Sequence, residues 1–188
     1  MRRRDWVNLS GPGARQFTCG YDDCGNRVSS SQGWFTNGQP QEYVYICPHC
    51  TRPTYFGDQG QVPGVAPGNE VSHVPDETAK LYMEARKCVS VGSATASVLA
   101  ARKLLMHIAV AQGAKVGDSF IAYVEFLASN GYVPPNGKGW VNHIRQKGNE
   151  ANHEIKLMTA DDATELISFC EMLLKFIYEF PNRVPVKK

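Results

Sequence analysis

The spacing of apolar residues changes near Pro75, and this change divides the chain into two parts. Before Pro75, apolar and polar residues alternate over short stretches such as 42–46 and 54–56, a pattern typical of half-buried β-strands. Asn37 and Gly38 lie between such stretches and are typical turn residues, so a small β-hairpin is predicted there. After Pro75, apolar residues recur every three or four positions, which predicts amphipathic helices.

Five helices are predicted in the second part, with a turn at 134–137 between the third and the fourth. They cover residues 76–91, 93–113, 118–130, 140–157 and 159–180. Between the two parts, residues 57–75 carry repeated glycine and proline with few apolar side chains, which predicts a linker. The expected organisation is a small β domain at 1–56, a linker at 57–75 and a helical domain at 76–188.

Four of the six cysteines form two close pairs in the β-rich part. The pairs are Cys19 with Cys24 and Cys47 with Cys50, separated by four and by two residues. Such spacing lets each pair hold one side of a tetrahedral zinc ion, and four cysteine ligands leave no open position for catalysis. We therefore expect a zinc ribbon with a structural Zn²⁺. The fold class expected is mostly α, with this small β zinc ribbon followed by an α-helical bundle.

Two disulfides are the alternative for the same four cysteines. The chain begins with a basic cluster but has no apolar run behind it, so a secretory signal is not expected. A cytoplasmic location follows as an expectation, and thiols stay reduced there, which favours a metal site over disulfides. The two remaining cysteines, Cys88 and Cys170, fall among apolar residues and are expected to be buried free thiols.

Composition and charge disfavour several classes of protein. With 43% hydrophobic and 20% charged residues among 188, the chain is close to ordinary globular proteins rather than to disordered or collagen-like ones. Its apolar stretches fall short of the roughly 20 residues of a membrane span, so no membrane partner is expected. A net charge of +2 does not indicate a strongly basic nucleic-acid binder, so any contact with nucleic acid needs a local patch.

Two groups of side chains in the first part have both a structural and a functional interpretation. The first group is aromatic and comprises Trp34, Tyr43, Tyr45, Tyr55 and Phe56. They either stack on nucleic-acid bases or form the small core, and the core is favoured because so small a module has few other residues to bury. His49, between two ligands, and His73, in the linker, are expected to be bystanders rather than zinc ligands.

The predicted helix at 140–157 has an unusual polar face. Its core face is narrow and carries Trp140, Ile144, Gly148, Ala151 and Ile155. The opposite face, about 100° wide, carries Asn142, Arg145, Asn149, Asn152, His153 and Lys156 and no carboxylate. Basic and amide groups without an acidic neighbour suit a phosphate group. An ordinary solvated helix face is the alternative, and composition alone favours it.

The segment 144–153 reads Ile-Arg-Gln-Lys-Gly-Asn-Glu-Ala-Asn-His and resembles the signature of a bacterial family of uncharacterised helical domains. Residues 100–105 resemble the Ala/Arg-rich second helix of that family. The family is placed in the HEPN (higher eukaryotes and prokaryotes nucleotide-binding) superfamily, in which a zinc ribbon in front of the helices is familiar. The resemblance covers residues 76–181 and implies that the helical bundle is HEPN-like.

HEPN enzymes are metal-independent ribonucleases that bring an arginine and a histidine together across a dimer of helices. Carried onto this chain, the resemblance implies Arg145 and His153 as catalytic residues, with Asn149 beside them. His153 would deprotonate a ribose 2′-hydroxyl and Arg145 would stabilise charge on the phosphate. Asn142, Asn152 and Lys156 would then bind the substrate.

Two functions are compatible with these residues. The first is a ribonuclease, or an RNA- or nucleotide-processing effector of the toxin or phage-defence type, which acts as a homodimer and uses the ribbon to recruit RNA or a protein partner. The second is a non-catalytic module, in which the ribbon and the bundle bind a nucleotide, a nucleic acid or a protein partner. The sequence leaves open whether the protein is an enzyme.

Overall fold

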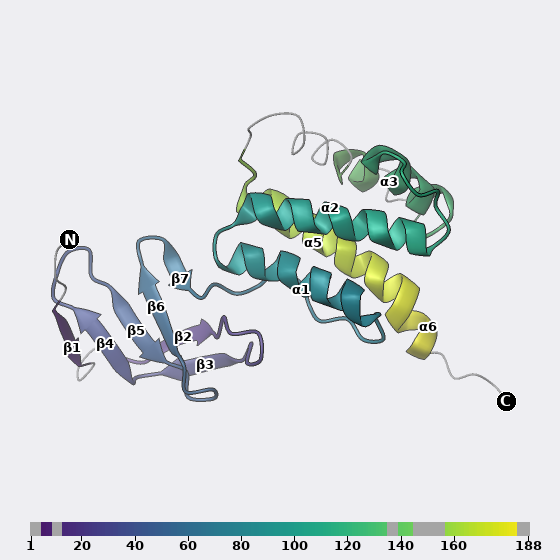
Figure 1. Cartoon of the computed structure of the whole chain (residues 1–188). Coiled ribbons are helices and arrows are strands. Elements are labelled where there is room, and N and C mark those ends of the chain that lie inside the picture. The colour runs from purple at the N-terminus through teal and green to yellow at the C-terminus, as the bar shows by residue number, and fades with distance from the viewer. Residues whose placement is uncertain (1–4, 9–12, 135–138, 145–156, 184–188) are drawn as a thin grey trace. The chain divides into compact units, whose positions relative to one another are not determined.

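The computed structural model describes residues 5–8, 13–134, 139–144 and 157–183, and the chain divides into two compact units, 1–66 and 67–188 (Figure 1). The first unit contains the strands and the second contains the helices. Helices make up 46% of the described residues, so the fold is mixed α/β rather than mostly α as predicted. The difference arises because strands occupy much of the first unit, including short polar segments that lack a clear alternation.

The N-terminal unit, called the ribbon below, consists of two antiparallel sheets. The larger sheet has the order β1-β4-β5-β6-β7 and comprises β1 (Trp6–Asn8), β4 (Gly33–Thr36), β5 (Tyr43–Ile46), β6 (Pro53–Gly57) and β7 (Gly60–Val62). The smaller sheet pairs β2 (Arg15–Thr18) with β3 (Arg27–Ser30). The predicted hairpin is confirmed as β4 and β5, and the strand predicted at 54–56 is β6.

Aromatic rings on one face of the larger sheet form the core of the ribbon. Phe17 of β2 packs against Tyr45 and Phe56, with ring centroids 6.3 and 5.3 Å apart, and all three side chains are buried. Trp34 pairs with Val44 across β4 and β5 and therefore points to the opposite face, where it is 41% exposed. The core interpretation thus applies to Tyr45 and Phe56 and not to Trp34.

The stretch predicted as a linker contributes to both units. At its start, β7 pairs with β6 and completes the larger sheet. Further along, the guanidinium of Arg86 donates hydrogen bonds of 2.8 Å to the carbonyl oxygens of Pro67 and Gly68. Residues 67–74, called the strap below, are therefore held against the helices, because buried side chains bind the backbone groups that a free linker would leave to water.

The helices agree closely with the predicted positions. The helical unit contains α1 (Asp76–Ser90), α2 (Ala94–Ala111), α3 (Phe120–Ser129), α5 (Ala160–Leu174), a π-helical turn η2 (Lys175–Glu179) and α6 (Phe180–Arg183). Residues 139–144 are also helical. Thr159 caps α5 as predicted and forms a capping box with Asp162. The cap of α3 is Ser119, whose hydroxyl accepts from the N–H of Ala122, one residue after the predicted start at 118.

The last predicted helix continues beyond its expected end. Helical backbone runs through η2 into α6, which contains Pro181, where the prediction ended the helix. A proline ring in a regular α-helix clashes with the carbonyl group four residues earlier. The π turn η2 has a wider backbone and lies just before Pro181. It gives the proline ring the room that it needs, so the helix continues.

Helix α2 is the centre of the helical unit and packs against α1, α3 and α5. Its side chains Leu104, Leu105 and Ile108 are fully buried. By length and composition, α2 is also the one helix in the described ranges that is long and apolar enough to cross a membrane, with a mean hydropathy of 1.3 over 18 residues. The expectation that no stretch approaches a membrane span is therefore wrong for α2, because a helix that packs against three others needs a similar composition.

Replacing Glu171 by glutamine is expected to make the helical unit less sensitive to acid. Glu171 on α5 accepts hydrogen bonds of 3.0 Å from the backbone and the side chain of Asn69 in the strap, and it pairs with Lys175. Burial acts to raise the pKa of this carboxyl, but the hydrogen bonds from Lys175 and Asn69 prevail and hold the pKa below its ordinary value of 4.5. The carboxylate therefore stabilises the fold above the unfolded pKa, and this contribution is lost as the pH falls through the folded pKa.

Urea unfolding near neutral pH and in acid measures this effect. The difference between the two midpoints should be smaller in Glu171→Gln than in the parent protein. Glu84→Gln, at an exposed position of α1, is the matched control and should behave like the parent. An equal acid sensitivity of Glu171→Gln and the parent would contradict the role of the strap contact.

Candidate metal centre

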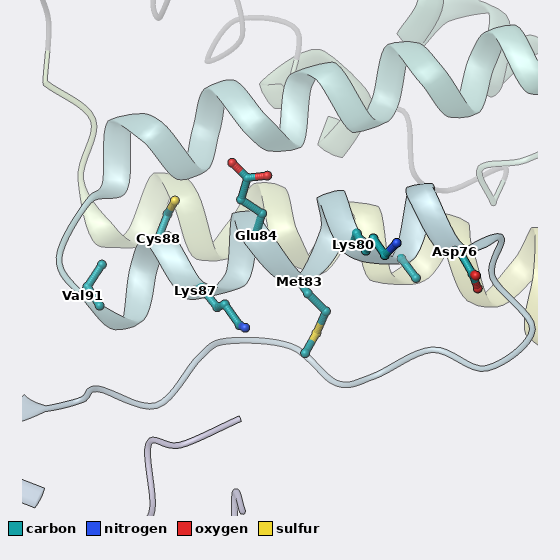
Figure 2. Close-up of a pocket in the computed structure, with 8 residues that line it drawn as sticks. Asp76, Lys80, Met83, Glu84, Lys87, Cys88 and Val91 are labelled. Atoms are coloured by element: carbon teal, nitrogen blue, oxygen red, sulfur yellow. The ribbon is translucent and has the colours of Figure 1, made fainter. Parts of the chain in front are cut away.

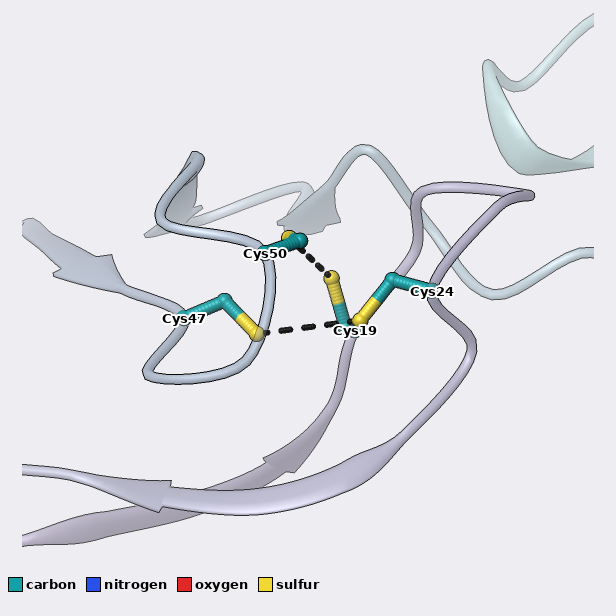
Figure 3. A group of neighbouring side chains, drawn as sticks. All are labelled: Cys19, Cys24, Cys47 and Cys50. Atoms are coloured by element: carbon teal, nitrogen blue, oxygen red, sulfur yellow. Dashed lines mark hydrogen bonds between the residues drawn. The ribbon is translucent and has the colours of Figure 1, made fainter.

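The four clustered cysteines come from two loops of the ribbon. Cys19 and Cys24 lie in the loop between β2 and β3, and Cys47 and Cys50 lie in the loop between β5 and β6. All four Sγ atoms lie within 4.8 Å of one another. Figure 3 shows the four side chains turned toward one another from the two loops. The fold thus brings together the predicted set of ligands.

The distances between the sulfur atoms fit a tetrahedral metal site. The Sγ atoms of Cys19 and Cys50 lie 3.7 Å apart, and those of Cys24 and Cys47 lie 3.8 Å apart. Zn–S bonds of about 2.3 Å in a regular tetrahedron place the sulfurs about 3.8 Å apart, whereas a disulfide joins two sulfurs at about 2.05 Å. All six cysteines are free, so the arrangement favours a bound metal ion over the two disulfides.

Tight turns of the backbone place each pair of cysteines. The N–H groups of Cys24 and Gly25 both donate to the carbonyl oxygen of Tyr21, at 2.9 and 3.0 Å, and the N–H of Thr51 donates to the carbonyl oxygen of Cys47 at 2.8 Å. Gly25 and Thr51 have φ angles of 57° and 59°. Glycine adopts this conformation without strain, so Gly25 is a sequence signal for the first turn, whereas Thr51 gives no such signal for the second.

Arg52 connects the two cysteine loops and adjusts the charge of the site. Its guanidinium pairs with Asp23 and lies 4.1 Å from the ring centroid of Tyr21. Burial acts to raise the pKa of Cys50, but hydrogen bonds from the backbone and side chain of Arg52 lower it to about 6. Burial raises the pKa of Cys19 to about 12. Because thiolates are the metal ligands, binding of a cation must release protons from the remaining thiols.

Two polar side chains approach the sulfur of Cys24 from outside the ligand set. The Nδ1 atom of His49 lies 3.7 Å from this sulfur, and the Nδ2 group of Asn26 donates to it at 3.6 Å. His49 was expected to be a bystander, and it is no member of the four-residue cluster. Contacts of this kind orient a ligand and adjust its charge. Sequence reasoning missed both contacts because they depend on how the two loops approach each other.

Gly20→Ala is expected to destabilise the ribbon, because the neighbouring backbone leaves no room for a side chain. A Cβ atom at this position would lie 2.1 Å from the carbonyl oxygen of Pro63 and 2.5 Å from that of Gly64. Overpacking that forces the backbone to move costs about 1–3 kcal/mol, occasionally more. Thermal unfolding of the metal-bound protein should show a lower midpoint for the ribbon in Gly20→Ala. Gly38→Ala, where a Cβ meets open space, is the control, and equal midpoints for the two variants would refute the close approach.

Asn142 is the one member of the predicted polar helix face within the described residues. The others, Arg145, Asn149, Asn152, His153 and Lys156, lie outside the described ranges. Within residues 139–144, Ile144 is buried, Asn142 is exposed and the ring of Trp140 packs edge-on against Phe169, with centroids 5.0 Å apart. The start of this helix therefore agrees with the predicted core and polar sides.

The sequence pattern did not predict two charged contacts in the helical unit. The Nε2 atom of His143 lies 2.7 Å from a carboxylate oxygen of Glu165, close enough for an ion pair but not aligned as a hydrogen bond. Arg102 is buried with its guanidinium 4.2 Å from the ring centroid of Phe120, and burial lowers its pKa. Within the described ranges its Nη1 has no hydrogen-bond partner. His107, on the same helix, is exposed and does not share the buried environment of Arg102.

A hollow of about 710 Å³ runs along one face of α1 (Figure 2). Lys80, Met83, Lys87 and Cys88 are among the residues that line it. Cys88 is therefore half-buried rather than fully buried as expected. Cys170 is fully buried as predicted, and burial raises the pKa of its thiol. A single half-buried thiol beside lysines does not by itself make a catalytic site.

The structure thus defines a protein with a cysteine-clamped β ribbon and a separate helical unit. A family described as a domain of unknown function (DUF4145) matches residues 83–188, which is more than half of the chain. The chain belongs to this family, whose match spans the predicted polar helix face and leaves the ribbon outside. Comparison with curated proteins and with solved structures gives no match.

Proposed function

We propose that this protein is a HEPN-like, metal-independent ribonuclease of the toxin or phage-defence effector type. The observation that carries the proposal is the acid-free helix face at 142–156, which combines Arg145, Asn149 and His153. The matched region at residues 83–188 spans this face, and Asn142 at its start is exposed. Reduced cysteines accord with a cytoplasmic enzyme.

In this proposal the metal bound by the ribbon is a structural zinc ion. Its support is the match between the observed sulfur spacing and the edge of a tetrahedron of Zn–S bonds. Four thiolates occupy every position of a tetrahedral ion, so the metal binds neither water nor substrate. Its role is to hold together a small unit that buries few apolar residues, and the ribbon is then free to recruit RNA or a protein partner.

The proposed reaction is cleavage of RNA by its own 2′-hydroxyl. His153 accepts the proton of this hydroxyl, and the oxygen attacks the adjacent phosphorus. A new bond from phosphorus to the 2′-oxygen forms as the bond to the 5′-oxygen breaks, and the leaving oxygen takes up a proton. Arg145 stabilises the charge on the non-bridging oxygens and Asn149 orients these groups. The products carry a 2′,3′-cyclic phosphate and a 5′-hydroxyl.

Substrate binding and assembly follow from the same face. In the sequence pattern, the same face carries Asn142, Asn152 and Lys156 together with the catalytic residues. These three side chains would bind the sugar-phosphate backbone. A single helix presents such a face to open solvent, so we propose a symmetric homodimer that places two faces together. Because the reaction needs a 2′-hydroxyl, DNA should not be cleaved.

Incubation of the purified chain with a mixture of single-stranded and structured RNA, with no added divalent cation, tests the proposal. We expect cleavage that leaves cyclic-phosphate and 5′-hydroxyl ends, while DNA of the same sequence stays intact. Intact RNA, or cleavage that requires added Mg²⁺, would reject the assignment.

The second candidate function is a non-catalytic module that binds a nucleotide, a nucleic acid or a protein partner. Seven residues separate Arg145 from His153, more than in the HEPN enzymes, and the net charge of +2 is small. Both observations favour binding without catalysis. Binding of intact RNA that weakens steeply with salt would indicate phosphate contacts, whereas a salt-insensitive complex would indicate a protein interface.

A further inference from the structure

The ribbon contains a cavity that lies apart from the cysteine cluster. It has a volume of about 340 Å³ and is lined by Arg15, Gln41, Tyr43, Phe56, Asp58 and Gln61, together with glycines of the β6–β7 turn. These residues come from β2, from the start of β5 and from the hairpin of β6 and β7. The cavity is at the small end of the range of ligand pockets, which suits a compact ligand.

Arg15 lies over an aromatic ring at this cavity. Its guanidinium carbon lies 4.0 Å from the ring centroid of Phe56. That ring is buried and packs edge-on against Phe17, with centroids 5.3 Å apart, so the core of the ribbon anchors the surface on which Arg15 rests. In the part of the chain that the structure describes, no hydrogen bond or ion pair engages the exposed guanidinium. None of the described residues therefore competes with a ligand for its donor groups.

The two glutamines are oriented by bonds to the protein, and each keeps one free polar group. The hydroxyl of Tyr43 donates to Oε1 of Gln41 at 2.7 Å, which leaves the amide N–H groups of Gln41 as donors. Nε2 of Gln61 donates to the carbonyl oxygens of Thr18 and Pro63, at 2.7 and 3.1 Å, which leaves its Oε1 as an acceptor. The amide orientation of Gln41 is thus fixed by Tyr43, which also lines the cavity, and that of Gln61 by two carbonyl groups outside it.

Asp58 adds a carboxylate to the same cavity. It is exposed in the turn between β6 and β7, and none of the described residues engages its side chain in a hydrogen bond or ion pair. Arg15 and Asp58 line one cavity without pairing with each other. The cavity therefore offers donors from Arg15 and Gln41 and acceptors from Asp58 and Gln61, beside the aromatic rings of the core.

We propose that this cavity binds an unpaired guanine base. Guanine is planar and presents two acceptors, O6 and N7, on one edge and two donor groups, N1–H and N2–H₂, on the next. Arginine pairs with O6 and N7 through two parallel hydrogen bonds, and a carboxylate accepts from N1–H and N2–H₂. A simple anion is disfavoured by Asp58 and a simple cation by Arg15, whereas guanine satisfies both. Because its pairing edge must be free, the base comes from a single strand or from a free nucleotide.

Fluorescence polarisation with labelled oligodeoxynucleotides tests the site in the full-length, metal-bound chain. The probes are oligothymidylate, the same strand with one central guanine, and the same strand with one central adenine. DNA lacks the 2′-hydroxyl that the proposed ribonuclease needs, so the measurement is independent of that proposal. We expect the guanine strand to bind about tenfold tighter than the other two, the scale of one good two-bond base contact.

Variants assign the preference to the cavity. Arg15→Met and Asp58→Asn should each remove most of the tenfold preference for guanine, because each deletes one of the two base-edge contacts. Arg27→Met is the matched control, since Arg27 is an exposed arginine on β3 that does not line the cavity. Guanosine monophosphate that competes as well as the strand would identify a free nucleotide as the source, and weak competition would identify the strand. Equal binding of all three strands, or a preference that survives both variants, would overturn the proposal.

Discussion

Removing the metal with a strong zinc chelator is expected to unfold the ribbon and leave the helical unit folded. The ribbon core among described residues consists of three buried aromatic rings and two buried cysteines, which is little apolar surface to offset the conformational entropy of the chain. Structural zinc sites contribute about 10–16 kcal/mol of apparent binding free energy near neutral pH. The helical unit has its own extensive core and needs no metal.

Cys47→Ser is expected to have nearly the same effect as chelation. Cys47 is fully buried, and its sulfur forms one side of the tetrahedron with Cys24. Cys88→Ser is the matched control, because this cysteine belongs to α1 and lies outside the cluster. Ellipticity at the helix band should be retained in both variants, and the fluorescence of Trp6 and Trp34, which lie in the ribbon, should change only in Cys47→Ser. Parallel loss of both signals, or a ribbon unaffected by chelation, would contradict the proposed role of the metal.

His153→Ala is expected to lower the rate of RNA cleavage by about 10²–10⁴-fold, the usual contribution of a general base. In the proposed reaction no other group on the helix face accepts the proton of the 2′-hydroxyl, because the face has no carboxylate. The parent rate should fall in acid, since a histidine that has gained a proton no longer acts as a base. Helical circular dichroism should stay unchanged, because the substituted residue belongs to the polar side of the predicted helix.

His107→Ala provides the matched control for this loss. His107 is an exposed histidine on α2 with no part in the proposed reaction. Its variant should cleave RNA at the parent rate and with the same pH profile. A fully active His153→Ala variant would remove the general base from the mechanism. Loss of activity in both variants would point to a general effect of histidine loss rather than to a specific catalytic group.

The sequence predicted those parts of the fold that depend on local chemistry. The bounds of α1 and α2 follow from the spacing of apolar residues and from the residues at the helix ends, which act within one or two turns. The four clustered cysteines follow from two short spacings, each closed by its own backbone turn. The β-rich part was underestimated because strands such as β2 and β7 are short and show no clear alternation, and because β1 pairs with β4 far along the chain.

The tertiary structure decided how distant segments use groups that are unremarkable in the sequence. The strap reads as a linker until Arg86 and Glu171 are seen to bind its backbone. The contact of His49 with Cys24 and the cavity around Arg15 depend on how separate loops and strands approach each other. None of these relations has a fixed sequence spacing, because a hydrogen bond or a ring contact needs only proximity in space.

The sequence by itself therefore determined the four cysteines of the cluster and the helices of the described ranges, and it predicted the polar face at 142–156, most of which lies outside those ranges. Thiolate chemistry, helix period and capping are properties of neighbouring residues, so they can be read along the chain. Only the tertiary structure decided that the four sulfurs converge at tetrahedral spacing, that the strap belongs to the helical unit, and that unpaired donors and acceptors line one cavity. These are distances between residues far apart in sequence, and packing of the folded chain sets them.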